Sequence, residues 1–175
     1  MTRPGLVHRK GLDMAGKMTH VGADGGPRMV DVSAKRRTRR TAVAAVQVHL
    51  SKAAATLLAS SGCTTAKGNV FECARLAGIM AAKRTGELIP LCHNLPLEHV
   101  DVKLALDGCV VRITATARAT AKTGVEMEAL TACAVAALTV YDMCKSIDKG
   151  IRIRNLGLVS KTGGKSGKWT REQDE

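Results

Sequence analysis

Aromatic residues are nearly missing from this chain of 175 residues, which contains one Phe, one Tyr and one Trp. The hydrophobic core must therefore consist of Ala, Val, Leu, Ile, Met and Cys. The chain is long enough to bury such a core in a single domain. The same scarcity argues against a protein that binds single-stranded nucleic acid, because such proteins stack bases on aromatic side chains.

The chain also lacks any Cys-x-x-Cys motif, although it contains six cysteines. Cys73 and Cys133 lie in apolar segments with helical periodicity, so we expect the cysteines to be reduced core residues. The longest uncharged segment is shorter than the roughly 20 residues that span a bilayer, and the N-terminus has no apolar signal core. These absences predict a soluble, cytoplasmic protein.

Acidic residues are outnumbered by basic ones, 15 against 27, for a formal net charge of +12. Residues 1–40 hold ten Lys or Arg against three Asp, so more than half of the excess lies there. Residues 1–28 combine six glycines with no hydrophobic period, which predicts a disordered basic tail. The run KRRTRR at 35–40 leaves two interpretations open, a patch for nucleic acid or polyphosphate and a solvated charged segment.

Hydrophobic periodicity predicts strands and helices after residue 40. Alternating apolar residues predict strands at 46–50, 100–106, 111–115 and 151–159, and Asp107-Gly108 predicts a hairpin between the middle two. Asn69, followed by Glu72 three residues later, predicts the start of a helix that ends near Lys83. With a longer helix over 122–145, the order predicts an α+β fold: a ferredoxin-like βαββαβ sandwich whose antiparallel sheet carries both helices on one face.

Residues 129–141 of the longer helix are uncharged, yet charged residues stand at both of its ends. Glu126 and Glu128 precede this segment, whereas Asp142 and Lys145 follow it at a spacing that places them side by side. The helix dipole accounts for the acidic start and the final Lys, but not for an Asp near the C-terminus. Because this helix is apolar nearly all round and a sheet covers only one side, we expect a second subunit to cover the rest.

Residues 88–96 contain two prolines, which predicts an extended loop that leads into a strand from about Leu97. His93 in this loop is either a ligand-binding residue or a surface residue of a connector. A zinc site that also uses His99 or Cys109 would fit no common ligand spacing.

The Gly/Lys-rich segment KTGGKSGK at 161–168 is not a Walker A loop, because Val159 replaces the first required glycine and no helix follows. It is either an anion-binding flap or part of a disordered basic tail. We therefore expect one domain over 29–160 and a flexible tail over 161–175.

Four segments in order resemble the cyclic pyranopterin monophosphate synthase family of molybdenum cofactor biosynthesis. They are MVDVSAK (29–35), KGNVFECARLAGIMAAKRTGELIPLCHNLPL (67–97), KTGVEMEALTACAVAALTVYDMCK (122–145) and KTGGKSG (161–167). The resemblance implies a lyase that converts (8S)-3',8-cyclo-7,8-dihydroguanosine 5'-triphosphate to cyclic pyranopterin monophosphate and releases pyrophosphate. It also implies ferredoxin-like homohexamers, built as trimers of dimers, with active sites at subunit interfaces.

The same resemblance implies roles for individual residues. Asp142 matches the catalytic acidic residue, with Lys145 beside it and Lys67 opposite as a proton-transfer pair. We expect the two lysines to lower each other's pKa, so that one of them can act as a base. The positions that match substrate-binding residues of the family are Leu91, Cys92, His93, Glu126, Met127, Glu128, Lys161 and Arg40.

Carboxylates at these positions would hold the N–H edge of a guanine-type ring, and the cations would neutralise the triphosphate. The scheme needs no metal ligands and no resident cofactor, while a Mg²⁺ ion that accompanies the triphosphate stays open.

One residue departs from the family pattern, because Asn94 follows His93 where the family usually has Pro. Loss of the ring predicts a less rigid loop. A non-catalytic basic protein, which binds nucleotides or nucleic acid through residues 28–40 and the C-terminal tail, stays open as an alternative. The sequence also leaves open whether this copy is the principal enzyme or a weakened paralogue.

Overall fold

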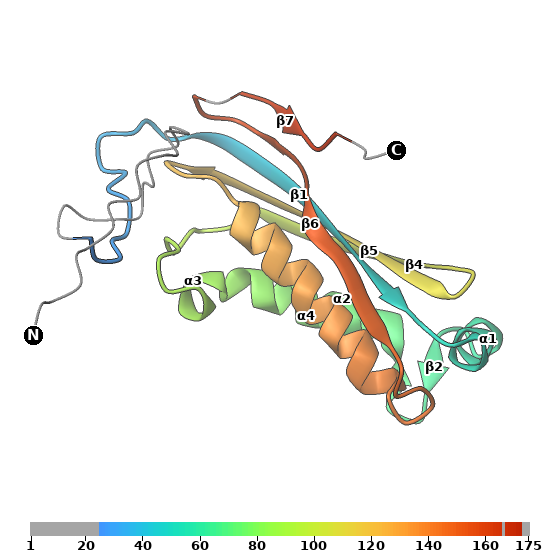
Figure 1. Ribbon diagram of the computed structural model, residues 1–175. Coiled ribbons are helices and arrows are strands. Elements are labelled where there is room, and N and C mark those ends of the chain that lie inside the picture. Colours follow the sequence, from blue (N-terminus) through green and yellow to red (C-terminus); the bar gives the residue numbers. More distant parts are fainter. Residues whose placement is uncertain (1–24, 166, 173–175) are drawn as a thin grey trace, which may run out of the picture.

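A computed structural model of the chain describes residues 25–165 and 167–172 (Figure 1). The elements, in chain order, are β1 (Thr38–His49), α1 (Lys52–Ser60), β2 (Thr64–Thr65), β3 (Gly68–Asn69), α2 (Val70–Lys83), α3 (Thr85–Leu88), β4 (His99–Asp107), β5 (Val110–Ala121), α4 (Glu126–Cys144), β6 (Arg152–Thr162) and β7 (Trp169–Thr170).

The main sheet has the strand order β4-β5-β1-β6-β7, and all of its pairs are antiparallel. Helices α2 and α4 lie against one face of this sheet, and α1 lies at the end where β1 finishes (Figure 1). Strands β1, β4, β5 and β6, together with α2 and α4, have the order and pairing of a βαββαβ sandwich. The predicted α+β, ferredoxin-like fold is therefore confirmed.

Several boundaries differ from the prediction. Strand β1 begins at Thr38, well before residue 46, because three residues of the basic run 35–40 belong to it. Helix α1 and the one-turn helix α3 were not predicted. The hairpin between β4 and β5 is confirmed, but Asp107 pairs with Val110, so the loop is Gly108-Cys109. Gly108 has φ +56°, a conformation that glycine adopts without strain.

Strand β6 continues past residue 160, where the sequence placed the end of the domain, and ends at Thr162. Strand β7 then pairs back on β6, with Lys161 opposite Trp169. Four residues of the predicted flexible tail, 161–175, thus belong to the sheet: Lys161, Thr162, Trp169 and Thr170. Most of the predicted N-terminal tail lies outside the described residues.

The core lies between the sheet and the two long helices and contains mostly small side chains. On β1 and β5, alternate residues are buried against the helices. Small residues also let the helices approach closely, since a Cβ at Gly78 of α2 would lie 2.9 Å from the carbonyl oxygen of Ala132 on α4. The core composition predicted from the sequence is confirmed by these buried residues: Ala42, Ala44, Val46, Val48, Val111, Ile113, Ala115, Ala117, Ala119 and Ala121.

Helix α4 packs against α2 and the sheet, but part of its surface stays open. Leu138 is 57% exposed and Met127 is also exposed. Leu76 and Met80 are exposed on the neighbouring α2. By length and composition alone α4 could cross a membrane, yet its most apolar stretch is mostly buried within this fold.

The cysteines follow the prediction only in part. All six are free. Cys133 and Cys144 are buried, as expected, whereas Cys73 and Cys109 are exposed. The prediction that the cysteines are core residues is therefore wrong for Cys73 on α2 and for Cys109 in the loop between β4 and β5.

Candidate active site

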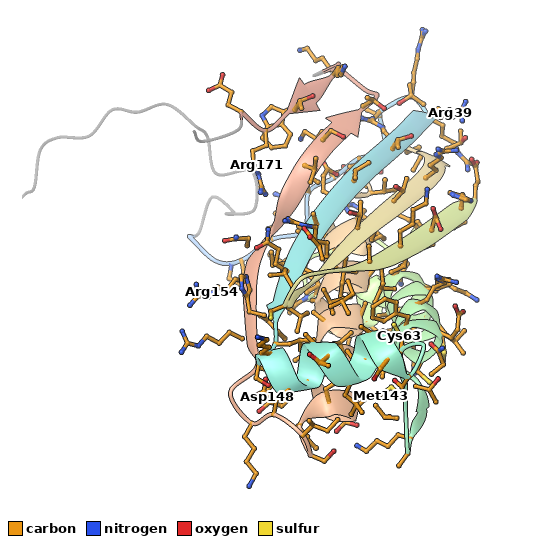
Figure 2. All side chains as sticks on the ribbon, turned by 90° about the vertical axis from the view of Figure 1, so that its right-hand side faces the viewer. Arg39, Cys63, Met143, Asp148, Arg154 and Arg171 are labelled. Carbon is orange, nitrogen blue, oxygen red and sulfur yellow. The ribbon has the colours of Figure 1, made fainter. Side chains whose placement is uncertain are left out.

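The predicted site residues fall into two groups at the two ends of α4. Lys67, Asp142 and Lys145 form a cluster at the C-terminal end. The remaining residues lie around its N-terminal end. In Figure 2, Arg39 and Met143, sequence neighbours of Arg40 and Asp142, lie at opposite ends of the molecule.

The C-terminal cluster consists of one carboxylate between two ammonium groups. Lys145 Nζ lies 2.7 Å from Asp142 Oδ1, one helical turn away. Lys67 Nζ lies 2.9 Å from Asp142 Oδ2 and also donates to the Asp142 carbonyl oxygen at 2.9 Å. This carbonyl is one of those that a helix end leaves without an intrahelical partner, so Lys67 also caps α4.

The contact between Lys67 and Asp142 forms within one chain. The turn between β2 and β3 carries Lys67, and it reaches the end of α4 within the same chain. His93, by contrast, stays with the N-terminal group, where its Nε2 lies 2.9 Å from the Val30 carbonyl oxygen.

Electrostatics hold this cluster in its ionised form. Hydrogen bonds from Lys145 and then Lys67, together with their charges, lower the pKa of Asp142 to about 2. The hydrogen bond to Asp142 and its charge raise the pKa of Lys145 above its ordinary value. The prediction that the two lysines depress each other's pKa is therefore wrong for Lys145, because the carboxylate between them outweighs their mutual repulsion.

A cavity of about 360 Å³, the cationic cavity, lies beside the N-terminal end of α4. Lys161 Nζ lies 2.9 Å from Glu126 Oε1 at its wall. Arg40 contributes a guanidinium whose buried Nε has no partner among the described residues. The charged side chains that line this cavity are Lys35, Arg40, Lys122, Lys161, Lys165 and Glu126. One carboxylate against five cations makes the cavity suited to a polyanion.

The glycine-rich loop after β6 shapes this cavity. Gly163 and Gly164 have φ values of +101° and +72°. A Cβ at Gly164 would collide with the guanidinium of Arg40, and one at Gly163 would meet the Arg39 carbonyl oxygen. Gly163 and Gly164 therefore lie in a loop that packs against Arg39 and Arg40, which favours the anion-binding flap over the disordered tail.

A second cavity of about 460 Å³, the adjoining cavity, shares Lys35, Thr123, Gly124 and Glu126 with the first. The other residues that line it are Val30, Ile89, Leu91, Cys92, His93 and Met127. The two cavities form one cleft with a cationic half and a less polar half. Such a pair of environments fits a ligand that joins phosphates to a ring system.

Glu128 lies behind this cleft rather than in its wall. Glu128 is 2% exposed. Cys92 Sγ donates to Glu128 Oε1 at 3.8 Å, while Glu128 Oε2 has no hydrogen-bond partner among the described residues. Burial is the main cause that raises the pKa of Glu128. Burial and the nearby Glu128 carboxyl also raise the pKa of Cys92 to about 11, so Cys92 is a thiol at neutral pH.

The structure also shows cleft residues that the sequence-based prediction missed. Lys35, Lys122, Thr123 and Val30 line the cleft without having been predicted as site residues. Lys35 and Lys122 lie inside the segments 29–35 and 122–145 that carry the family resemblance. Their position in those segments was the signal that could have identified them.

The basic run 35–40 is not a continuous basic surface. Arg37 donates from Nε and a terminal nitrogen to the Thr120 carbonyl oxygen, at 3.2 and 2.9 Å. Arg40 and Lys35 point into the cleft. Because three of its charges serve these separate purposes, the run does not support the nucleic-acid patch considered above.

Asn94 occupies a defined position next to Gly86. A Cβ at Gly86 would collide with Asn94 Oδ1, so the asparagine side chain lies directly on this glycine. This contact restrains the loop where the proline ring is missing.

Within residues 25–165 and 167–172, no group of three or more His, Cys, Asp or Glu side chains converges to form a metal site.

Comparison with known proteins gives a consistent result. A sequence profile described as MoaC family matches residues 29–164. The chain is 54% identical over 172 residues to the cyclic pyranopterin monophosphate synthase of Rhodospirillum rubrum, covering 97% of this chain and 99% of the relative. It is 51% identical over 159 residues to the protein of the same name from Chloroflexus aggregans, covering 90% and 95%. A third relative of that name, from Streptomyces coelicolor, is 51% identical over 161 residues.

Proposed function

The chain belongs to the MoaC family, and on this premise we propose that it is a cyclic pyranopterin monophosphate synthase. The observation that carries the proposal is the identity of 54% to a synthase of that name over nearly the whole of both chains. The substrate would be (8S)-3',8-cyclo-7,8-dihydroguanosine 5'-triphosphate, and the products cyclic pyranopterin monophosphate and pyrophosphate. This is the chemistry of a cytoplasmic lyase in an early step of molybdenum cofactor biosynthesis.

The cleft supports this substrate through its two environments. Five cations around the cationic cavity would neutralise the triphosphate and stabilise the leaving pyrophosphate. In the adjoining cavity, Leu91, His93 and Met127 would hold the ring system. A hydroxyl oxygen of the substrate would attack the α-phosphorus, whose bond to the bridging oxygen breaks as pyrophosphate leaves. No resident cofactor is needed, and any Mg²⁺ would arrive with the triphosphate.

The C-terminal cluster would supply proton transfer. Because Asp142 raises the pKa of Lys145, this lysine enters the reaction as an ammonium group and therefore as a proton donor. Asp142, with a pKa of about 2, stays ionised and orients both lysines. Lys67 would be the second proton-transfer residue, held opposite Lys145 on the same carboxylate.

A complete active site would need two copies of the chain. Asp142 lies 16 positions after Glu126 in α4, which corresponds to about 24 Å at the α-helical rise per residue. A small substrate in the cleft of one copy therefore does not reach the lysine cluster of the same copy. The exposed apolar residues of α2 and α4, Leu76, Met80 and Leu138, support a covering subunit.

A two-fold axis near Ala134 would place the two α4 helices antiparallel. Positions 126 and 142 are equidistant from 134, so the start of one helix would then lie beside the end of the other. We place this dimer within a homohexamer, built as a trimer of dimers with active sites at the subunit interfaces.

An assay on the cyclised substrate tests the proposal. The purified protein should form cyclic pyranopterin monophosphate and pyrophosphate. Lys67→Ala and Lys145→Ala should each lower kcat by about 10²- to 10⁴-fold, the usual contribution of a positioned general acid or base. Lys83→Ala, at the exposed end of α2, is the matched control and should keep full activity. Full activity in both cluster variants would reject the assigned roles, and no turnover by the unmodified protein would reject the function.

A further inference from the structure

A third cavity, of about 360 Å³, lies at the other end of the sheet from the cleft, where β1 ends and β6 begins. It shares no residue with the cleft and has the same volume as the cationic cavity. The residues that line it are His49, Leu50, Ser51, Asp148, Gly150, Arg152 and Arg154. Nothing in the proposed reaction uses this cavity.

Two arginines dominate its charge. Arg152 lies opposite His49 and Arg154 opposite Gln47 in the β1–β6 pair, so both arginines point to the sheet face away from the helices. At two residues apart on one strand, their Cα atoms are about 6.6 Å from each other. Neither guanidinium has a hydrogen-bond or ion-pair partner among the described residues. In Figure 2, Arg154 and Asp148 lie on the same side of the molecule, next to α1.

The single acidic residue of the cavity is occupied by backbone groups. Asp148 Oδ2 accepts from the Ser51 N–H at 2.6 Å, and Oδ1 accepts from the Gly150 N–H at 2.8 Å. These hydrogen bonds lower the pKa of Asp148, so it is ionised at neutral pH. It holds the cavity wall in shape, but it forms no ion pair with either arginine.

We propose that this cavity binds a phosphoryl oxyanion, either inorganic phosphate or pyrophosphate, between Arg152 and Arg154. Two guanidinium groups on one strand face can each form paired N–H···O hydrogen bonds to phosphoryl oxygens. The cavity is lined by one large apolar side chain, Leu50, and by no Phe, Tyr or Trp, so it offers little apolar surface to the base of a nucleotide. The ligand is therefore a free oxyanion rather than a nucleoside phosphate.

The experiment is a calorimetric titration of the full chain with phosphate, pyrophosphate and GTP at constant ionic strength. It compares the unmodified protein with Arg152→Gln/Arg154→Gln. The matched control is Arg112→Gln/Arg118→Gln, which removes the same charge from the same sheet face. Each protein is also titrated with the substitutions Arg40→Gln/Lys161→Gln added. These substitutions weaken binding in the cationic cavity, so the binding that is left can be assigned to the third cavity.

We make this comparison in proteins that also carry Arg40→Gln/Lys161→Gln. There, we expect Arg152→Gln/Arg154→Gln to weaken the binding of phosphate or pyrophosphate about tenfold or more, since each lost charge-assisted hydrogen bond is costly. Arg152→Lys/Arg154→Lys should lose less, because it keeps the charge but not the paired geometry. The control should be unaffected.

Three results would overturn the inference. The control variant could weaken binding as much as Arg152→Gln/Arg154→Gln does, or GTP could bind this cavity as tightly as phosphate or pyrophosphate. Chloride could also bind as tightly as phosphate, which would mark an adventitious ion only. A different result would count against the proposed function: Arg40→Gln/Lys161→Gln, made in the otherwise unmodified protein, would have no effect on pyrophosphate binding.

Discussion

At the scale of single residues, the cluster of Lys67, Asp142 and Lys145 shows how one carboxylate sets the state of two lysines. Asp142 is about half exposed, yet two short ion pairs keep it ionised. Because these groups are exposed, their contribution to folding is weakened by solvent, and their importance lies in fixing protonation states.

This cluster predicts a specific pH dependence of stability. The pKa of Asp142 falls from 3.8 to about 2 on folding, so its stabilisation is complete above pH 3.8 and is lost as the pH drops towards 2. The stabilisation that goes with the raised pKa of Lys145 is complete below pH 10.5 and is lost as the pH rises beyond that value. Urea unfolding of the protein and of Asp142→Asn should differ most at intermediate pH and converge in acid. A difference that stays constant down to pH 2 would contradict this.

Glu128 should change the stability with pH in the opposite direction to Asp142. Its carboxyl is buried, and the raised pKa means that the folded state binds a proton more tightly than the unfolded chain. The free energy of unfolding should therefore decrease as the pH rises above 4.5. The groups that face it are Cys92, which stays neutral, and Glu126, which adds negative charge.

Glu128→Gln keeps the shape of the side chain and removes this titration. Thermal unfolding measured from pH 4 to pH 8 should show a flatter profile for the variant than for the unmodified protein. Glu126→Gln serves as the comparison, because Glu126 is held by Lys161 instead of being left unpaired. Parallel profiles for Glu128→Gln and the unmodified protein would show that Glu128 titrates as an ordinary carboxylate.

At the scale of elements, the close packing of α2 on α4 positions both halves of the site. Gly78 lies against the Ala132 carbonyl oxygen and the Ala136 side chain, so α4 can lie close to α2 and to the sheet at once. The loop that carries Leu91, Cys92 and His93 follows from α2 through α3, and its position depends on the same contact.

Gly78→Val should therefore destabilise the fold. Its added atoms meet a backbone oxygen that cannot move away, and overpacking of this kind costs about 1–3 kcal/mol. Ala77→Val, the neighbouring position on α2 and only half-buried, makes a β-branched residue without that collision. Chemical denaturation of both variants should show the larger loss for Gly78→Val, and equal losses would locate the effect in helix propensity instead.

The sequence predicts elements well where periodicity and capping signals are strong. Asn69 caps α2 through its side chain, which accepts from the Glu72 N–H at 3.0 Å as expected. The sequence predicts the start of β1 too far along the chain, because Arg39 and Arg40 belong to a run of charged residues that resembles a solvated segment. In the structure both residues belong to β1, and their side chains point to opposite faces of the sheet. Strand β7 has two residues and depends on its pairing with β6, so no local pattern marks it.

At the scale of the whole molecule, the two half-sites at opposite ends of α4 predict complementation between inactive variants. Lys161→Ala disables the cleft, and Lys145→Ala disables the lysine cluster. In a two-fold dimer that contains one of each, one composite site is intact and the other carries both defects.

Random mixing at equal amounts should recover about a quarter of full activity, since half of the dimers are mixed and each holds one intact site. The measurement is an activity assay after the two proteins are co-refolded. Lys145→Ala mixed with Asp142→Asn is the control, because both defects lie in the same half-site and no recovery is expected. Absence of recovery in the first mixture would mean that each chain completes its own site.

By itself the sequence determined the order of the main strands and helices, the composition of the core and the membership of the family, because these depend on local periodicity and on long motifs. Tertiary structure decided which charges meet. Lys67 reaches Asp142 across 75 residues of sequence, and Lys161 reaches Glu126 across 35. It also decided that these pairs lie at opposite ends of a 19-residue helix. Such contacts depend on how loops pack against helix ends, which no local pattern encodes.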